Sequence, residues 1–302
     1  MNASRGKTAF CFPGQLQEKP IIKRDHPLRE VPYFKELLKR SSGPTEVDFL
    51  NFSVEDEDLA LKLQLSTYFL SMVHFYRLKT AGWNPDIFVE HSMGIYSALA
   101  ASEAITFEEG LWITEAIGRI LKREGEIRPG GMAAIIGLPL AKIQEICEEI
   151  DGFQVHIANY NGSMHFVLSG EEKGVDKAMS IALSRKAISA TRLTSRTALH
   201  SPLLYSLRDE IMMLLEEIKI QSPRVPVLNH WTVKPLKREE IKDFLSQEIG
   251  QPVYWTQCVE KLLQEGVTRF VEVGHETTLT KLMRWINRGA EAFSAGDRLV
   301  LS

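Results

Sequence analysis

The sequence predicts an α/β protein in which a parallel sheet is split by a small inserted domain. Strand-like and helix-like segments alternate at both ends of the chain, and the order of elements between them is βαββαβ, the ferredoxin-like arrangement. Glycines and a proline at 125–132 mark the start of the insertion. Since 302 residues are enough for two domains, we place the large domain at 1–127 and 198–302 and the small domain at 128–197.

The first part of the large domain carries two junctions between a strand and a turn. Residues 8–12 are apolar and β-rich, and a Pro-Gly pair ends this strand just before Gln15. Apolar residues at helical spacing predict a helix over about 56–80. A second strand, 86–90, leads into a sharp turn at 92–94 and then into a helix of small apolar residues.

The other elements follow from the same patterns of apolar spacing and chain breaks. The small domain is predicted to contain strand 132–138, helix 139–150, strands 153–162 and 164–170, helix 171–186 and strand 188–195. The large domain then resumes with helix 201–220, strand 225–230, helices 238–249 and 256–266, and strand 268–274.

The composition is that of an ordinary globular protein. Hydrophobic residues make up 44% of the chain and charged residues 25%, which excludes a disordered or collagen-like protein. The formal net charge of -3 gives the whole molecule no field that attracts nucleic acid. Three cysteines in no paired pattern predict neither a disulfide framework nor a metal site. Because no signal peptide and no apolar run of about 18 residues is present, we expect a cytoplasmic protein that does not enter a membrane.

The turn at VEHSMG, residues 89–94, is the strongest candidate for chemistry. A serine between a strand and a helix, with a glycine two residues later, forms most of the G-x-S-x-G nucleophile elbow. Ser92 is therefore the candidate nucleophile, although Glu90 stands where the motif has its first glycine. His200, at the return from the small domain to the large one, is the candidate base. The backbone amides of Gln15 and Met93 are candidates for an oxyanion hole.

Several segments together resemble one family over residues 8–288. The chain is similar to the malonyl-CoA:acyl carrier protein transacylases and to the acyltransferase domains of fatty-acid and polyketide synthases. The segments that carry this resemblance, in order and spacing, are FPGQ, HSMG with YSAL, GMAAIIGL, SGEE, HSP, PVYW, and FVEVG followed by LT.

The resemblance implies an α/β-hydrolase-like large domain with a ferredoxin-like insert and the active site between them. It implies that Ser92 takes the acyl group as an ester, that His200 acts as base and then acid, and that a backbone carbonyl near Glu248 orients the imidazole. By the same likeness no cofactor is bound permanently, the substrate is an acyl-coenzyme A thioester, the acceptor is a holo acyl carrier protein, and the enzyme is a monomer.

One departure from the family concerns the substrate. In members that transfer malonyl groups, an arginine in a segment R-G-[RK] pairs with the free carboxylate of the substrate. Ile117 takes its place here, and Arg119 points about 200° away from it on a helix. Since a buried carboxylate facing isoleucine has no partner, we expect an uncharged acyl group. Leu199 either completes an apolar wall with Ile117 or packs in the core.

Three further departures fall on loops near the serine. Glu90 either faces the pocket, where it would repel a malonate-like group, or turns to solvent. Leu16 and His275 replace residues that the family usually has in loops at the mouth of the site, and His275 is otherwise a solvated surface residue.

Two groups of residues are candidates for binding coenzyme A or the carrier protein. From Lys177 to Arg208 there is no acidic residue. This basic stretch either attracts phosphates and an acidic protein or is a solvated face. Its candidate binding residues are Arg185, Lys186, Arg192 and Arg196. Asn159 and Asn161 either bind a pantetheine arm or belong to an ordinary turn.

The sequence thus predicts a serine acyltransferase that loads a non-carboxylated acyl group onto a carrier protein in fatty-acid or polyketide biosynthesis. Two alternatives use the same serine and histidine. One is a hydrolase that clears thioesters from a carrier protein, with water as the acceptor. The other is malonyl transfer, in which Arg119 or Arg196 replaces the missing arginine. A docking module without chemistry is disfavoured because both Ser92 and His200 are present.

Overall fold

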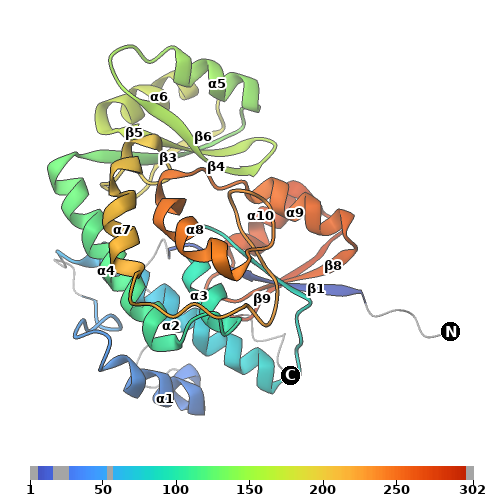
Figure 1. Ribbon diagram of the computed structural model, residues 1–302. Helices are drawn as coiled ribbons and strands as arrows, with labels where there is room; N and C mark the ends of the chain where they lie inside the picture. Colours follow the sequence, from blue (N-terminus) through green and yellow to red (C-terminus); the bar gives the residue numbers. More distant parts are fainter. Residues whose placement is uncertain (1–5, 16–26, 53–56, 297–302) are drawn as a thin grey trace.

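The computed structural model describes residues 6–15, 27–52 and 57–296. Over these residues the chain forms a parallel sheet and a separate antiparallel sheet, with the smaller domain above the larger one in Figure 1. The predicted α/β fold with an inserted βαββαβ unit is confirmed. Leu16 lies outside the described residues.

The large domain is built on a parallel sheet with strand order β7-β2-β1-β8-β9. Its strands are β1 (Lys7–Phe12), β2 (Ile87–Glu90), β7 (Val227–Leu228), β8 (Val267–Glu272) and β9 (Glu291–Ser294). Phe12 is paired in register with Glu90, so β1 and β2 end at the same edge of the sheet. The loops that follow them, 13–15 and 91–93, therefore begin side by side.

Helices cover both faces of this sheet. Phe10 and Phe12 of β1 pack into one core, with α2, α3 and α4, while Ala9 and Cys11 pack into a second core with α9 and α10. The helices are α1 (Pro32–Ser41), α2 (Leu59–Thr80), α3 (Gly94–Ala101), α4 (Phe107–Ile127), α7 (Arg208–Leu215), α8 (Ile241–Gln247), α9 (Trp255–Gln264) and α10 (Thr278–Ile286). Short 3-10 turns lie at Pro27–Glu30, Pro202–Leu207, Arg238–Glu240 and Glu248–Gly250.

The small domain is an antiparallel sheet with strand order β4-β5-β3-β6. It consists of β3 (Gly130–Ile136), α5 (Leu140–Glu148), β4 (Val155–Gly162), β5 (His165–Glu171), α6 (Glu172–Ser184) and β6 (Ser189–Arg192). Both helices pack on one face of the sheet. Its other face contributes Met132, Ala158 and Val167 to a small core against Leu199, at the return to the large domain.

Some elements differ from those the sequence predicts. The helix expected over 201–220 is a 3-10 turn followed by α7, and the strand expected over 225–230 is paired only at Val227–Leu228. The strand ends there because the side chain of Asn229 accepts hydrogen bonds from the amides of Trp231 and Thr232, at 3.1 and 2.7 Å, and turns the chain. Sequence analysis did not identify α1, α10 or β9. None of the described helices has the length and apolar character needed to cross a lipid bilayer.

Candidate active site

Ser92 lies in a strained turn between β2 and α3. Its φ of 58° is in the left-handed region, which few non-glycine residues adopt. Gly94 makes this turn possible, since a Cβ at that position would lie 2.2 Å from the carbonyl oxygen of Phe12. The amide of His91 donates to the same oxygen at 3.0 Å. The turn is thus held against the end of β1, and its strain is typical of a functional residue.

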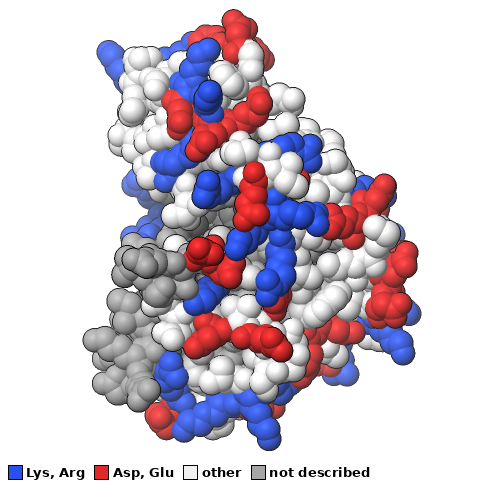
Figure 2. Space-filling view, turned by 90° about the vertical axis from the view of Figure 1, so that its left-hand side faces the viewer, with Lys and Arg blue, Asp and Glu red and all other residues white. Residues whose placement is uncertain are grey.

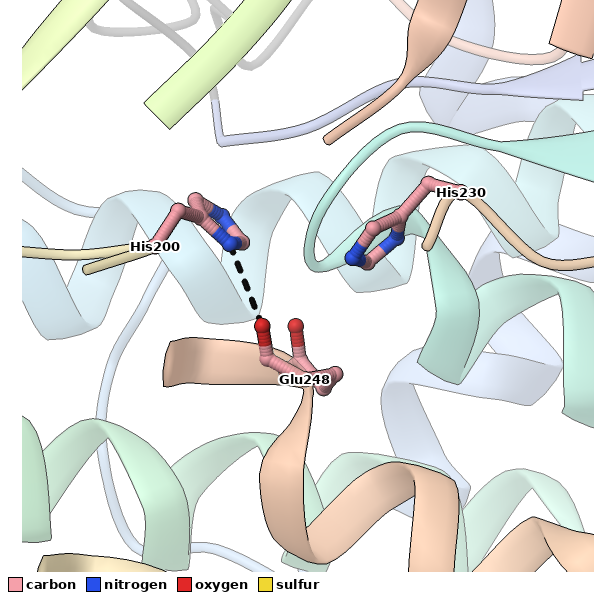
Figure 3. Close-up of side chains that lie close together, drawn as sticks. All are labelled: His200, His230 and Glu248. Atoms are coloured by element: carbon pink, nitrogen blue, oxygen red, sulfur yellow. Dashed lines mark hydrogen bonds between the residues drawn. The ribbon is translucent and has the colours of Figure 1, made fainter. Parts of the chain in front are cut away.

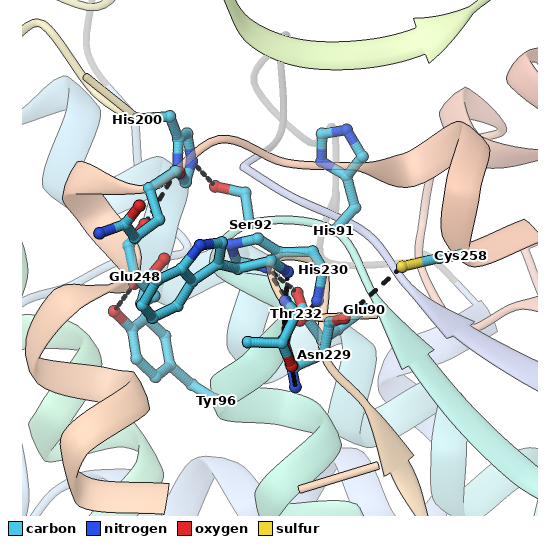
Figure 4. A network of polar contacts seen from close by, with 12 residues as sticks. Glu90, His91, Ser92, Tyr96, His200, Asn229, His230, Thr232, Glu248 and Cys258 are labelled. Atoms are coloured by element: carbon cyan, nitrogen blue, oxygen red, sulfur yellow. Dashed lines mark hydrogen bonds and ion pairs between the residues drawn. The ribbon is translucent and has the colours of Figure 1, made fainter. Parts of the chain in front are cut away.

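His200 and Ser92 are in hydrogen-bond contact, as Figure 4 shows. Ser92 Oγ lies 2.6 Å from His200 Nε2. His200 Nδ1 lies 3.2 Å from the carbonyl oxygen of Glu248 and 2.9 Å from that of Gln251. Because carbonyl oxygens only accept hydrogen bonds, Nδ1 carries the proton and the lone pair of Nε2 faces the serine hydroxyl. This tautomer is the one that a general base requires.

Burial favours the neutral form of His200. The residue is 4% exposed, and burial together with the neighbouring His230 lowers its pKa to about 3. Near pH 7 the imidazole is therefore free to accept a proton. An imidazolium at this position would be correspondingly costly, and it would need stabilisation from its surroundings.

The loops after β1 and β2 bring Gln15 and Met93 to the same cavity as Ser92 and His200. Met93 precedes the first turn of α3, and its amide donates to no acceptor among the described residues. The side chain of Gln15 accepts a hydrogen bond from Gln64 of α2 at 3.3 Å. The amides of Gln15 and Met93 thus stand at the place where an oxyanion hole is expected.

The cavity at Ser92 has a volume of about 50 Å³ and a largely apolar wall. Ile117 of α4 is 2% exposed and lines it together with Leu121, Leu199 and Ile249. Within the described part of the chain, no lysine or arginine lines this cavity. Arg119 is bound to Glu115 on the outer side of α4, so it supplies no cation to this cavity.

Two larger cavities adjoin this pocket. One, of about 360 Å³, shares Gln15, Gln64, Leu121 and Leu199 with it and has Arg196 in its wall. The other, of about 260 Å³, lies between the two domains and reaches Ser92 from the side of the small domain. Arg196 therefore borders a neighbouring cavity rather than the one at Ser92.

Asn159 and Asn161 of β4 line the cavity between the domains. Asn161 Oδ1 accepts a hydrogen bond from His91 Nε2 at 2.9 Å, and the Oδ1 atom of Asn159 is buried without a partner among the described residues. Burial lowers the pKa of His91 to about 4, so this histidine is neutral and acts as a hydrogen-bond donor. His275 is not among the residues that line this cavity. It is partly buried rather than a solvated surface residue, with its ring centroid 6.0 Å from that of His74 of α2.

Both expectations for Glu90 are wrong. Its side chain faces neither the acyl pocket nor solvent, since it is fully buried and accepts hydrogen bonds from His230. The reason is the pleat of β2: Glu90 ends the strand, and its side chain points toward the loop that follows the neighbouring strand β7. Glu90 is therefore no part of the acyl pocket.

Two of the four candidate arginines and lysines are already paired within the small domain. Arg185 binds Glu145 of α5 and Glu149 just after it, and Arg192 binds Glu172 and Asp176 of α6. Arg185 and Arg192 are therefore corrected to structural ion pairs, whose acidic partners come from these two helices and their ends. Lys186 and Arg196 are exposed and form no ion pair with the described residues.

Acidic and basic side chains also alternate on the face that Figure 2 presents, on which no charge of one sign dominates.

Sequence analysis missed the buried partners of the site. His230, Tyr96 and Gln64 all lie within reach of the Ser92 pocket or of Glu248. The position of His230 depends on the strand order, because β7 pairs with β2 and the loop after β7 therefore lies beside the end of β2, where Glu90 is found. No local sequence signal reveals that order. A second group that was missed is the set of exposed cations on and after α10: Lys281, Arg284 and Arg288.

Comparison with known proteins places the chain among acyltransferases. The sequence matches the acyl transferase domain family over residues 61–294. It is 29% identical over 299 residues to the malonyl CoA-acyl carrier protein transacylase of Bacillus subtilis (strain 168), with 96% of this chain and 94% of the relative covered. The acyl-carrier-protein S-malonyltransferase of Burkholderia pseudomallei 1710b has a TM-score of 0.90 at 28% identity, over 98% of both chains. A malonyl-transacylase in complex with a type II polyketide synthase acyl carrier protein has a TM-score of 0.89 at 26% identity, over 98% of this chain and 97% of that one.

Proposed function

The chain belongs to the acyl transferase domain family, and we propose that it moves an acyl group without a free carboxylate from coenzyme A, through an ester on Ser92, to the thiol of an acyl carrier protein. The observation that carries this proposal is the contact of 2.6 Å between Ser92 Oγ and His200 Nε2 at a cavity with no lining cation. The similarity to transacylases that act on carrier proteins supports the choice of acceptor.

The reaction follows from the tautomer of His200. As Ser92 Oγ attacks the thioester carbonyl carbon, its proton passes to His200 Nε2. The amides of Gln15 and Met93 donate to the oxyanion of the tetrahedral intermediate. When the carbon–sulfur bond breaks, His200 returns the proton to the departing thiol, and Ser92 holds the acyl group as an ester. The thiol of the carrier protein then reverses these steps.

The choice of acyl group rests on the charges around the pocket. A malonyl carboxylate placed beside Ile117 would be desolvated without a cation to bind it. Glu248, which also lines this cavity, would add repulsion whenever it is ionised. An acetyl group or a longer alkyl chain meets neither obstacle. The adjoining cavity of about 360 Å³ offers room for the longer chain.

The carrier protein is proposed to dock beside α10. The first turn of this helix lines the cavity between the domains, and Asn159 and Asn161 border the same cavity as candidates for contact with the pantetheine arm. Lys281, Arg284 and Arg288 expose positive charge further along α10 and just after it, next to the half-exposed Trp285. Such a patch suits an acidic partner.

Intact-protein mass spectrometry tests the proposed reaction. The protein is mixed with acetyl- or longer acyl-coenzyme A, and a holo carrier protein is then added. We expect an acyl adduct that persists for minutes alone and moves to the carrier, and no adduct on Ser92→Ala. Ser97→Ala is the matched control and should be acylated normally, since it removes a buried hydroxyl of α3 that has no hydrogen-bond partner among the described residues.

Two results would contradict the proposal. An adduct on Ser92→Ala would exclude Ser92 as the nucleophile. An adduct that water removes faster than the carrier protein would identify a hydrolase.

A further inference from the structure

A buried polar cluster lies directly behind His200. Glu90 Oε2 is 2.7 Å from His230 Nδ1, and Glu90 Oε1 accepts a hydrogen bond from the backbone amide of His230 at 2.7 Å. The hydroxyl of Tyr96 donates to Glu248 Oε1 at 2.7 Å. The side chains of Glu90 and His230 are fully buried, and Glu248 is 1% exposed. These residues come from β2, α3, the loop after β7 and the 3-10 turn after α8, so the fold gathers them from distant parts of the chain.

Two polar atoms in this cluster are left without partners. Glu248 Oε2 and His230 Nε2 are both buried and make no hydrogen bond among the described residues. One nitrogen each of His200 and His230 and a carboxylate oxygen of Glu248 lie within 4.8 Å of one another. Figure 3 shows the three side chains around a common space. Because these groups are buried and lie close together, a charge on one of them acts strongly on the others.

His200 lacks the partner that a base usually has. Its Nδ1 atom faces only the carbonyl oxygens of Glu248 and Gln251, which carry partial charges. A full negative charge lies close to the imidazole when the side chain of Glu248 is ionised, since one of its carboxylate oxygens is within 4.8 Å of a His200 nitrogen. Inside a protein, a charge at this distance is weakly screened.

We propose that the Glu248 carboxylate, held by Tyr96 and by the Glu90–His230 pair, is a positioning residue that stabilises the His200 imidazolium formed when Ser92 loses its proton. This rests on the proposed function of Ser92 and His200. In this step the proton moves from Ser92 Oγ to His200 Nε2 and is not passed on to Glu248. Glu248 forms no bond in the step and acts only through its charge.

The groups around Glu248 place the ionisation of its carboxyl near neutral pH. Burial raises the pKa of Glu248 to about 7, opposed by His230 and Tyr96. Burial acts to lower the pKa of His230, but Glu90 and Glu248 outweigh it and raise the pKa above its ordinary value.

The other groups that face the cluster stay neutral. Burial raises the pKa values of Tyr96 and of Cys258 on α9, and burial lowers those of His91 and His200. As pH rises through about 7, Glu248 therefore loses its proton and gains the negative charge that faces His200.

The rate of Ser92 acylation against pH tests this proposal. With a saturating acyl-coenzyme A and rapid quenching, the rate should rise as pH increases through about 7, because the carboxylate appears there. Glu248→Gln should lose this inflection and acylate on the order of tenfold more slowly above it. Tyr96→Phe removes a hydrogen bond to the carboxylate and should move the inflection to higher pH.

Glu272→Gln is the matched control. Glu272 is also a buried carboxyl with a pKa raised by burial to about 7, but it binds the start of α10 and not the cluster. Its substitution should leave the inflection in place.

An unchanged inflection in both Glu248→Gln and Tyr96→Phe would overturn the proposal, and the folded state of each is checked by thermal unfolding. If Glu248→Gln does not fold, the shift in Tyr96→Phe decides alone. The proposed function fails separately, if Ser92→Ala is still acylated.

Discussion

Among single residues, Ile117 has the clearest consequence for substrate choice. It is 2% exposed and stands in the wall of the cavity at Ser92, where a guanidinium could pair with a substrate carboxylate. Ile117→Arg should raise the preference for malonyl- over acetyl-coenzyme A by about tenfold to a hundredfold, since a charge-assisted bidentate contact is worth about 1.5–3 kcal/mol. The ratio of the two Ser92 adducts measures it.

The control for this change is Ile117→Met, which keeps the volume and adds no charge. It should leave the preference as it is. If a folded Ile117→Arg protein shows the same preference as the unchanged protein, the pocket excludes malonate for some other reason.

At this scale the sequence predicted what local motifs carry. Ser92 followed from a strand, a tight turn and a glycine, and His200 from its place in a family pattern. Glu90 was misinterpreted, because its partner His230 is 140 residues away and the contact depends on which strand lies beside β2. The buried neighbours of Glu248 were missed for the same reason.

Among the elements, α10 has two roles that can be measured. Its exposed cations are proposed to meet the carrier protein, so Lys281→Glu or Arg284→Glu should raise the KM for the carrier by roughly tenfold. Acylation of Ser92 by coenzyme A thioesters should be unchanged, and the effect should weaken as salt is added. Lys219→Glu, an exposed lysine outside the patch, is the charge control and should have little effect. Equal KM values for all three variants would exclude α10 as the docking surface.

The start of α10 is fastened to β8 by a buried carboxyl. Glu272 accepts hydrogen bonds from the amides of Leu279 and Thr280 at 3.0 and 2.8 Å, and burial raises its pKa to about 7. Between pH 4.5, the ordinary pKa of a glutamate, and pH about 7, Glu272 holds a proton in the folded protein that it releases in the unfolded chain. The stability of the folded protein therefore falls as pH rises through this range.

Glu272→Gln removes that dependence. The free energy of unfolding of the variant, minus that of the unchanged protein, should increase by about 1–3 kcal/mol between pH 4.5 and pH 7 and level off above, because only the unchanged protein loses stability over this range. Urea denaturation at a series of pH values measures it. A difference that stays constant with pH would show that Glu272 does not titrate in this range.

Elements with strong periodicity were predictable and those defined by tertiary contacts were not. The helix at α2 and the order of the small domain followed from apolar spacing alone. The short β7 was predicted too long, because the side chain of Asn229 turns the chain after two paired residues. The basic stretch after Lys177 looked unopposed only because its acidic partners lie on α5 and at the start of α6.

For the whole molecule, the arrangement of two domains bears on how a chain of net charge -3 would receive the anionic thioester and the acidic protein that we propose as its substrates. The contact between Ser92 and His200 lies at the carboxyl edge of the parallel sheet, and the cavity of about 260 Å³ between the domains leads to it. Charges of both signs are mixed over the face seen in Figure 2, so attraction must come from local groups such as those of α10.

The central claim is that this acyltransferase selects an uncharged acyl group. The most direct measurement is competition: the protein is offered equal concentrations of malonyl- and acetyl-coenzyme A, and the mass of the adduct on Ser92 is read before any carrier protein is added. We predict an adduct that is predominantly acetyl, because no lysine or arginine lines the described cavity at Ser92. A predominantly malonyl adduct would contradict the account, since it would require a cation that reaches the pocket from elsewhere.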